Sequence, residues 1–240
     1  MAYLLPLVQN LRTPLSNLHR RPPTNNSFHR KVANDLLHER GTVYSSREQL
    51  PMAAQLVSGS LRPLFLPYNN VWRSGRKLMH HLAMARAADS YQPLQEMESI
   101  RLLKDLIREP EEYEKSFERY SAGLILRLAF GKVVVTGEEE YVRRILGVVH
   151  TVERVASPGA YLVDTLPWLV YLPDSIAPEG KRLHEEELEL FRGLQDDIRQ
   201  QMRNGKGVEG NQKNFTEKLL SEKEKWNLSD DEGAYVVGTL

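Results

Sequence analysis

Residues 66–80 read LPYNNVWRSGRKLMH, and this stretch carries more information about the fold than any other part of the chain. If it is helical from Val71, Trp72 and Arg76 stand one turn apart on one face, since residues i and i+4 are neighbours on a helix. The indole N–H and the guanidinium are both hydrogen-bond donors, and the guanidinium is permanently cationic. Such a pair suits a carboxylate or a phosphate. The alternative is a structural pair, in which Trp72 is half-buried at a helix interface and Arg76 lies beside it.

The composition is that of a globular protein with one sizeable core: 240 residues, of which 41% are hydrophobic and 27% charged. The chain has no cysteine, which excludes disulfides, thiolate metal ligands and cysteine nucleophiles. Residues 1–86 hold 12 Lys and Arg against 3 Asp and Glu, whereas residues 87–240 hold 20 against 29. No nucleic-acid motif accompanies the basic third, so we expect a basic and an acidic face of one fold and no nucleic-acid partner.

No stretch of the sequence reaches the roughly 18 apolar residues that a membrane span requires. Met1–Val8 is a short apolar patch, but no cationic region precedes it and no small-residue cleavage site follows it. We therefore expect neither a signal peptide nor a membrane anchor in this chain.

Hydrophobic residues recur at helical spacing through most of the chain, and only residues 132–135 suggest a strand, which predicts a mainly α fold. Proline-rich residues 1–28 are predicted to form an irregular lead-in, and residues 29–240 one helical domain. Two long connections are expected, at 47–67, with room for one short helix, and at 157–180. The predicted helices cover residues 30–40, 71–89, 92–108, about 117–130, 136–152, 183–202, 215–220 and 229–237.

Start and stop signals bound several of these helices. Thr136–Glu139 and Ser229–Glu232 have the spacing of a capping box, in which an N-cap hydroxyl and a Glu three residues later satisfy backbone N–H groups reciprocally. Gly41, Gly131 and the run Asn204–Gly207 are predicted to end helices.

The familiar catalytic motifs are missing: there is no G-x-S-x-G elbow, Walker loop or dinucleotide fingerprint. His80 and His81 are adjacent, so their rings point in different directions, and no H-x-x-x-H pair suggests zinc. The acidic run Glu185–Glu187 is expected on the solvated face of the long helix. No nucleophile stands with a base, so we predict no catalytic residue and no metal ligand within this chain.

Taken in order, the motifs resemble the N-terminal half of a cytochrome P-450, a haem-thiolate monooxygenase, of the fungal microsomal type. Residues 66–80 resemble the third long helix of that family, which carries a W-x-x-x-R signature. The likeness spans about Val32 to Leu240. Four further segments follow the family's order of elements: Tyr91–Pro110, Arg119–Lys132, Ser157–Pro173, which resembles the loop over the substrate pocket, and Ser229–Leu240, which resembles the start of the long central helix.

The resemblance implies the N-terminal helical part of the cytochrome P-450 fold, truncated at the start of the long central helix. It also implies a haem cofactor and O₂-dependent oxidation of an apolar small-molecule substrate. In that family the Trp and the Arg donate to the haem propionates, so Trp72 and Arg76 are predicted to bind the cofactor, with His80 as a third candidate. Asn69 and Asn70 stand where the family often has a glycine.

The same resemblance implies an NADPH-dependent reductase as partner, with Arg73 and Lys77 on the surface that receives electrons, and an endoplasmic-reticulum setting for the family. Residues 50–66 and 157–173 would line or cap the substrate pocket. The family's cysteine loop, E-x-x-R pair and acid–alcohol pair find no counterpart here, so we expect a fragment or truncated gene product that is inactive alone. The alternative is a non-catalytic helical interaction protein, whose basic Arg12–Arg86 region binds an acidic partner.

Overall fold

The computed structural model describes residues 26–157, 159–171, 178–205 and 213–240, and every regular element within these ranges is a helix. The mainly α fold is therefore confirmed. Residues 132–135, where the sequence suggested a short strand, are irregular. The chain divides into two compact units, Met1–Ser46 and Arg47–Leu240, which are described separately.

The first unit contains α2 (Asn26–Ala33), the π-helical turn η1 (Asn34–Glu39) and α3 (Gly41–Tyr44). The helix predicted over residues 30–40 ends at Glu39, next to the predicted stop at Gly41, and Gly41 then begins the short helix α3. Most of the predicted lead-in, residues 1–25, lies outside the described residues, and α2 begins three residues before the expected start of the helical domain.

The second unit begins with η2 (Pro51–Val57), the short helix expected within residues 47–67. Helix α4 (Asn70–Ala83) follows, and its N-terminus is capped by Asn69, whose side-chain oxygen accepts from the Trp72 backbone N–H at 2.8 Å. Gly75, Leu78 and Leu82 form the buried face of α4. The two asparagines noted in the sequence therefore start the helix.

The boundary between the next two helices differs from the prediction. Met84 has extended backbone angles, φ −68° and ψ 159°, so α4 ends at Ala83 rather than at Asp89. Helix α5 (Ala85–Arg108) then starts seven residues earlier than predicted and contains Pro93 in its interior. It pairs with α6 (Tyr113–Phe130) through the buried Glu98 and Arg119, whose side chains lie 2.9 Å apart.

The predicted end of α6 is confirmed. Gly131 has the left-handed angle φ 64°, and its N–H bonds the Arg127 carbonyl at 3.0 Å, as in a glycine-capped C-terminus. Between α5 and α6 lies the single turn η3 (Pro110–Glu112).

The first capping-box prediction was wrong. Helix α7 (Glu140–Val155) begins four residues after Thr136, and no side chain caps its N-terminus. The Glu139 carboxylate turns back and accepts the backbone N–H groups of Val135, Thr136 and Gly137 at 2.8–2.9 Å. Partial burial opposes ionisation, but these hydrogen bonds outweigh it and lower the pKa of Glu139 from 4.5 to about 2.

We expect Glu139→Gln to lower the free energy of unfolding at pH 7 by about 1 kcal/mol, the usual net contribution of an intramolecular hydrogen bond. Because the pKa is lower in the folded state, the stabilisation is complete above pH 4.5 and disappears as pH falls towards 2. Urea unfolding of both proteins at several pH values measures this difference. The exposed neighbour Glu138→Gln is the control, and equal effects of the two changes at pH 7 would contradict the assignment.

The remaining helices follow the predicted pattern more closely. In α12, Ser229 and Glu232 form a complete capping box, which confirms the second capping-box prediction. Helix α9 ends at Arg203, next to the predicted stop. Residues 172–177 of the second long connection lie outside the described part of the chain. In order, these elements are α8 (Leu162–Thr165), η4 (Pro167–Tyr171), α9 (Pro178–Arg203), α10 (Phe215–Ser221), α11 (Lys223–Trp226) and α12 (Asp230–Gly238).

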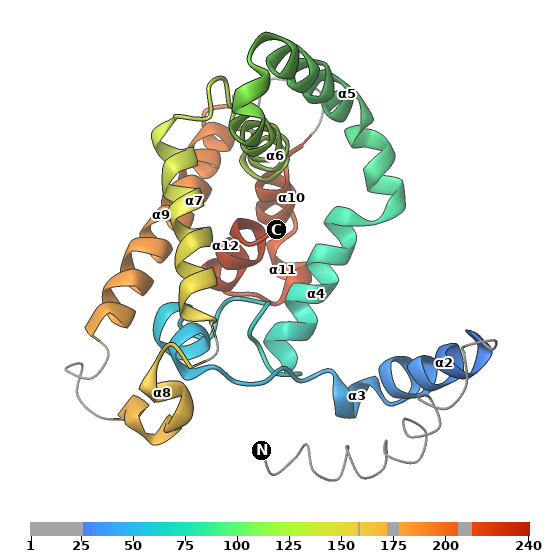
Figure 1. The fold of residues 1–240 in the computed structure, drawn as a ribbon, viewed down its shortest axis with the longest axis vertical. Helices are drawn as coiled ribbons and strands as arrows, with labels where there is room; N and C mark the ends of the chain where they lie inside the picture. Colours follow the sequence, from blue (N-terminus) through green and yellow to red (C-terminus); the bar gives the residue numbers. More distant parts are fainter. Residues whose placement is uncertain (1–25, 158, 172–177, 206–212) are drawn as a thin grey trace. The chain divides into compact units, whose positions relative to one another are not determined.

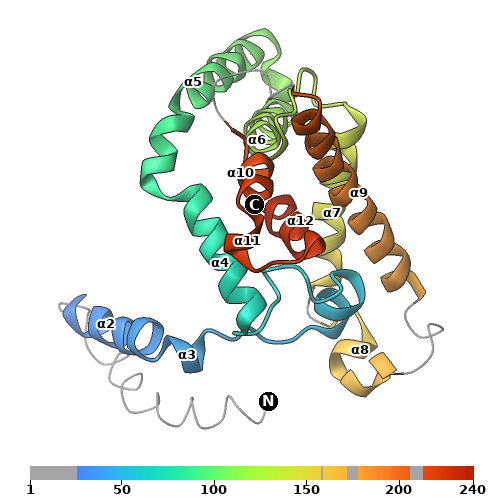
Figure 2. The same cartoon turned by 180° about the vertical axis from the view of Figure 1, so that it is seen from behind.

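Helix α12 lies at the centre of the second unit, where α4, α9 and α10 contact it (Figures 1 and 2). Its residues 233–237 are all buried, and they join a core made with α4, α5, α6, α7 and α9. A smaller hydrophobic cluster joins η2 to Val155, Val163 and Leu169. This second cluster packs the segment before α4 against α7, α8 and η4.

Candidate functional site

Trp72 and Arg76 are neighbours on α4, as their spacing predicted. The Arg76 guanidinium carbon lies 5.9 Å from the centre of the indole ring, and the centres of the Tyr68 and Trp72 rings are 5.1 Å apart. Trp72 is half-buried and Arg76 is exposed. Within the part of the chain that the structure describes, the indole N–H and the guanidinium of this pair have no hydrogen-bond acceptor, so both can donate to a ligand.

His80 lies one turn further along the same flank of α4 and is exposed. Its neighbour His81 points elsewhere and packs against the Trp226 ring at 5.1 Å, which is the divergence expected of adjacent histidines. Arg73 lies over the Tyr68 ring at 5.8 Å, and Lys77 is exposed. The α4 helix therefore presents two arginines, one lysine and one histidine outside its buried face.

A buried ion pair that the sequence did not indicate joins the segment before α4 to α9. Arg62 and Glu187 contact each other directly and are only 7% and 3% exposed. Burial lowers the pKa of Arg62 to about 10. The prediction that residues 185–187 all lie on the solvated face of α9 was therefore wrong for Glu187, since it shares the inner face with Leu190 and Leu194.

His184 of α9 contacts both the segment before α4 and α12. Its Nδ1 lies 3.0 Å from the Val57 carbonyl oxygen and 3.2 Å from the hydroxyl of the buried Tyr235 on α12. Burial raises the pKa of Tyr235. Gly59, with φ +55°, lies directly against the imidazole ring. Residues 57–62 are therefore fixed onto α9 by a hydrogen bond and an ion pair, and the Arg62 guanidinium carbon lies 6.0 Å from the centre of the Tyr235 ring of α12.

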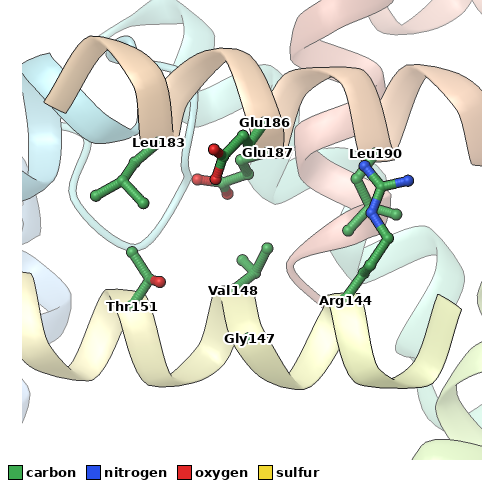
Figure 3. Close-up of a pocket in the computed structure, with 8 residues that line it drawn as sticks. All are labelled: Arg144, Gly147, Val148, Thr151, Leu183, Glu186, Glu187 and Leu190. Atoms are coloured by element: carbon green, nitrogen blue, oxygen red, sulfur yellow. The ribbon is translucent and has the colours of Figure 1, made fainter. Parts of the chain in front are cut away.

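Figure 3 shows a pocket of about 310 Å³ between α7 and α9. No motif in the sequence marks it, because its two walls come from helices separated by a long connection. The spacing of residues 144, 148 and 151 nevertheless places them on one face of α7. Eight residues line the pocket: Arg144, Gly147, Val148, Thr151, Leu183, Glu186, Glu187 and Leu190.

A family model for cytochrome P-450 matches residues 21–240, so this chain belongs to the cytochrome P-450 family, whose cofactor is haem. It is 31% identical over 214 residues to cytochrome P-450 monooxygenase 58 of Postia placenta, covering 88% of this chain and 40% of that protein. It is 31% identical over 216 residues to the monooxygenase virE of Hypocrea virens, covering 86% and 37%. For the monooxygenase fogE of Aspergillus ruber the identity is 30% over 210 residues, covering 86% and 38%.

The chain therefore spans about two fifths of the length of the curated relatives that it matches. The family predicted from the order of motifs is confirmed, and so is the helical fold. Among the helices in the described ranges, none has the length and apolarity to cross a membrane.

Proposed function

We propose that this chain supplies the propionate-binding side of the haem pocket of a cytochrome P-450 monooxygenase, which inserts one oxygen atom from O₂ into an apolar organic substrate. Family membership supports the class of reaction. The observation that carries the site is the pair of donors on α4, Trp72 and Arg76, which face outward without an acceptor in the described part of the chain.

The pair fits a propionate for physical reasons. The guanidinium supplies a charge-assisted hydrogen bond to a carboxylate, and the indole N–H adds a second donor that needs no counter-charge. The stacking of Arg76 on Trp72 limits the positions that the guanidinium adopts. His80, one turn away, is a weaker third donor. These residues bind and orient the carboxylates, while the haem, when bound, supplies the activation of O₂.

The chain has no cysteine, so a thiolate ligand for haem iron cannot come from these 240 residues. We therefore propose that the chain is a fragment of the catalytic protein and is inactive by itself. In the whole enzyme, Arg73 and Lys77 would contribute to the surface that meets an NADPH-dependent reductase, since both are cationic side chains on the exposed side of α4.

Titration of the chain with haemin tests the propionate assignment. Trp72→Phe keeps an aromatic ring but removes the N–H, and Arg76→Gln removes the charge; each should weaken haemin binding about tenfold, as expected for a charge-assisted hydrogen bond. The exposed Lys77→Gln serves as the matched control on the same helix. Haemin dimethyl ester, which lacks free carboxylates, should bind all four proteins alike.

Three results would contradict this proposal. Unchanged haemin affinity in both α4 variants would remove the propionate role, as would equal effects on haemin and on its dimethyl ester. A red-shifted Soret band of the thiolate type in the reduced carbon-monoxide complex would contradict the statement that this chain lacks the iron ligand. We expect no such band.

A further inference from the structure

A second cavity, of about 550 Å³, lies where the end of α9 meets α10, α11 and the start of α12. Its volume is within the range that small-molecule sites enclose. None of its residues belongs to α4, so it is separate from the proposed propionate-binding face. Six residues line this cavity: Arg199, Met202, Arg203, Leu220, Lys223 and Asp230.

The lining of the cavity is strongly cationic. Three of its six side chains are Arg or Lys and one is a carboxylate, which gives a formal charge of +2. By comparison, the pocket in Figure 3 is lined by one cation and two carboxylates, and a pocket at α5 and α6 by three of each. A phosphate monoester carries nearly two negative charges at pH 7. The cavity at the end of α9 matches this charge, and the other two pockets do not.

The carboxylate of the cavity is shared between two cations, and a third cation is left over. Asp230 contacts Lys223 at 2.7 Å and Arg199 at 3.5 Å. Arg199 also contacts Asp196, which lies outside the cavity, and the charge remains positive when Asp196 is counted. Arg203 has no acidic partner within the described residues. The dipole of α9 favours a cation at its last residue, but this accounts for Arg203 alone, since Lys223 comes from α11.

The cavity also has an apolar part. Met202 of α9 is 36% exposed, and Leu220 of α10 is partly buried. The methionine thioether makes favourable contacts with aromatic rings. An apolar group attached to the bound anion would therefore lie against these two side chains.

We propose that this cavity binds a small phosphate monoester whose organic group is apolar or aromatic. The phosphoryl group presents three strong acceptor oxygens to the three cations, Arg199, Arg203 and Lys223. Its organic group lies on Met202 and Leu220. A carboxylate is less suitable, because it offers one charge and two oxygens to three cationic side chains.

The probe is phenyl phosphate, titrated into the full 240-residue chain at low ionic strength and followed by calorimetry. Arg203→Gln should weaken its binding about five- to tenfold, as expected for a partly exposed charge-assisted hydrogen bond. Arg182→Gln is the matched control, since it makes the same change on the same helix about 30 Å away, at 1.5 Å per residue. Phenol, which lacks the phosphate, should bind wild type and both variants alike, and more weakly than phenyl phosphate binds wild type.

A change that removes the carboxylate of the cavity tests the charge argument in the opposite direction. Asp230→Asn frees Lys223 and should tighten phenyl phosphate binding about three- to fivefold. The capping box of α12 does not involve this side chain, and thermal unfolding shows whether the variant is folded. Glu222→Gln removes the same charge outside the cavity and is the control, with little expected effect.

Inorganic phosphate separates the charged part of the cavity from the apolar part. Met202→Ala should weaken phenyl phosphate binding about threefold and leave the affinity for inorganic phosphate unchanged. Arg203→Gln should weaken the binding of both. Loss of inorganic phosphate affinity in Met202→Ala, to the same extent as phenyl phosphate affinity, would contradict the apolar contact.

Four results would overturn the proposal. The first is the absence of saturable phenyl phosphate binding to the wild-type chain, including the case in which the chain pellets with vesicles of phosphatidic acid, which carry the same group on a membrane surface. The second is equal affinity in Arg203→Gln and Arg182→Gln. The third is Asp230→Asn binding no tighter than Glu222→Gln, and the fourth is phenol binding as tightly as phenyl phosphate. Haemin titrations of these variants should match wild type, which separates this site from the one on α4.

Discussion

Glu187→Leu should lower the free energy of unfolding by about 3–5 kcal/mol, because it leaves the Arg62 guanidinium buried without a counter-ion. Both side chains of the pair are less than a tenth exposed. A guanidinium cannot avoid this penalty by losing its proton near neutral pH, since even the lowered pKa of Arg62 is about 10. Arg62→Leu should have an effect of similar size for the converse reason, an unpaired buried carboxylate.

The double variant Arg62→Leu/Glu187→Leu should recover most of this loss, since replacing both members of a buried ion pair by apolar residues is often close to neutral. Urea unfolding of the wild type, both single variants and the double variant gives the coupling energy directly. Glu186→Leu, at an exposed position beside the pair, is the control and should change stability by less than about 0.5 kcal/mol. If Glu187→Leu were no worse than this control, the ion pair would not be buried as described.

Gly59→Ala should lower the free energy of unfolding by about 2–4 kcal/mol, from backbone strain and a steric clash together. The glycine has φ +55°, and an added Cβ would lie 2.4 Å from Cε1 of His184. The imidazole cannot easily move away, because its Nδ1 donates to the Val57 carbonyl oxygen and lies beside the Tyr235 hydroxyl.

Gly205→Ala separates the two contributions. Gly205 also has a positive φ, +67°, but a Cβ there meets nothing within 4 Å, so this variant should lose only the strain, about 1 kcal/mol. The difference between the two variants, measured by thermal or urea unfolding, is then the clash with His184. Equal losses at the two positions would show that the ring moves freely out of the way.

The helices that the sequence predicted best are those with local signals. Periodic apolar residues and the left-handed Gly131 marked α6, and the Ser229 capping box marked α12. The break at Met84 was missed because Met84 and its neighbours Ala83, Ala85 and Arg86 all favour helix, so no local signal marks it. Thr136 was misleading because Glu139 uses its carboxylate on the preceding turn rather than on the helix that follows.

In the candidate site, too, the contacts between residues close in sequence could be predicted and the contacts between distant residues could not. Trp72 and Arg76 are four residues apart on one helix, so their contact could be predicted from spacing alone. Arg62 and Glu187 are 125 residues apart, and no local pattern brings them together. The available signal was the position of Glu187 among the leucines on the inner face of α9. Arg62 also shows that the charge excess of residues 1–86 is not entirely a surface property.

The contacts of residues 57–62 also bear on the order in which this unit assembles. The ion pair and the His184 contacts close a loop of more than a hundred residues. Closing this loop costs conformational entropy, and the contacts that offset the cost form only once α9 is in place. Local helices form before contacts of such long sequence separation. We therefore expect the segment that begins with η2 to attach late in folding, and in the folded protein its stability depends on contacts with a helix far along the chain.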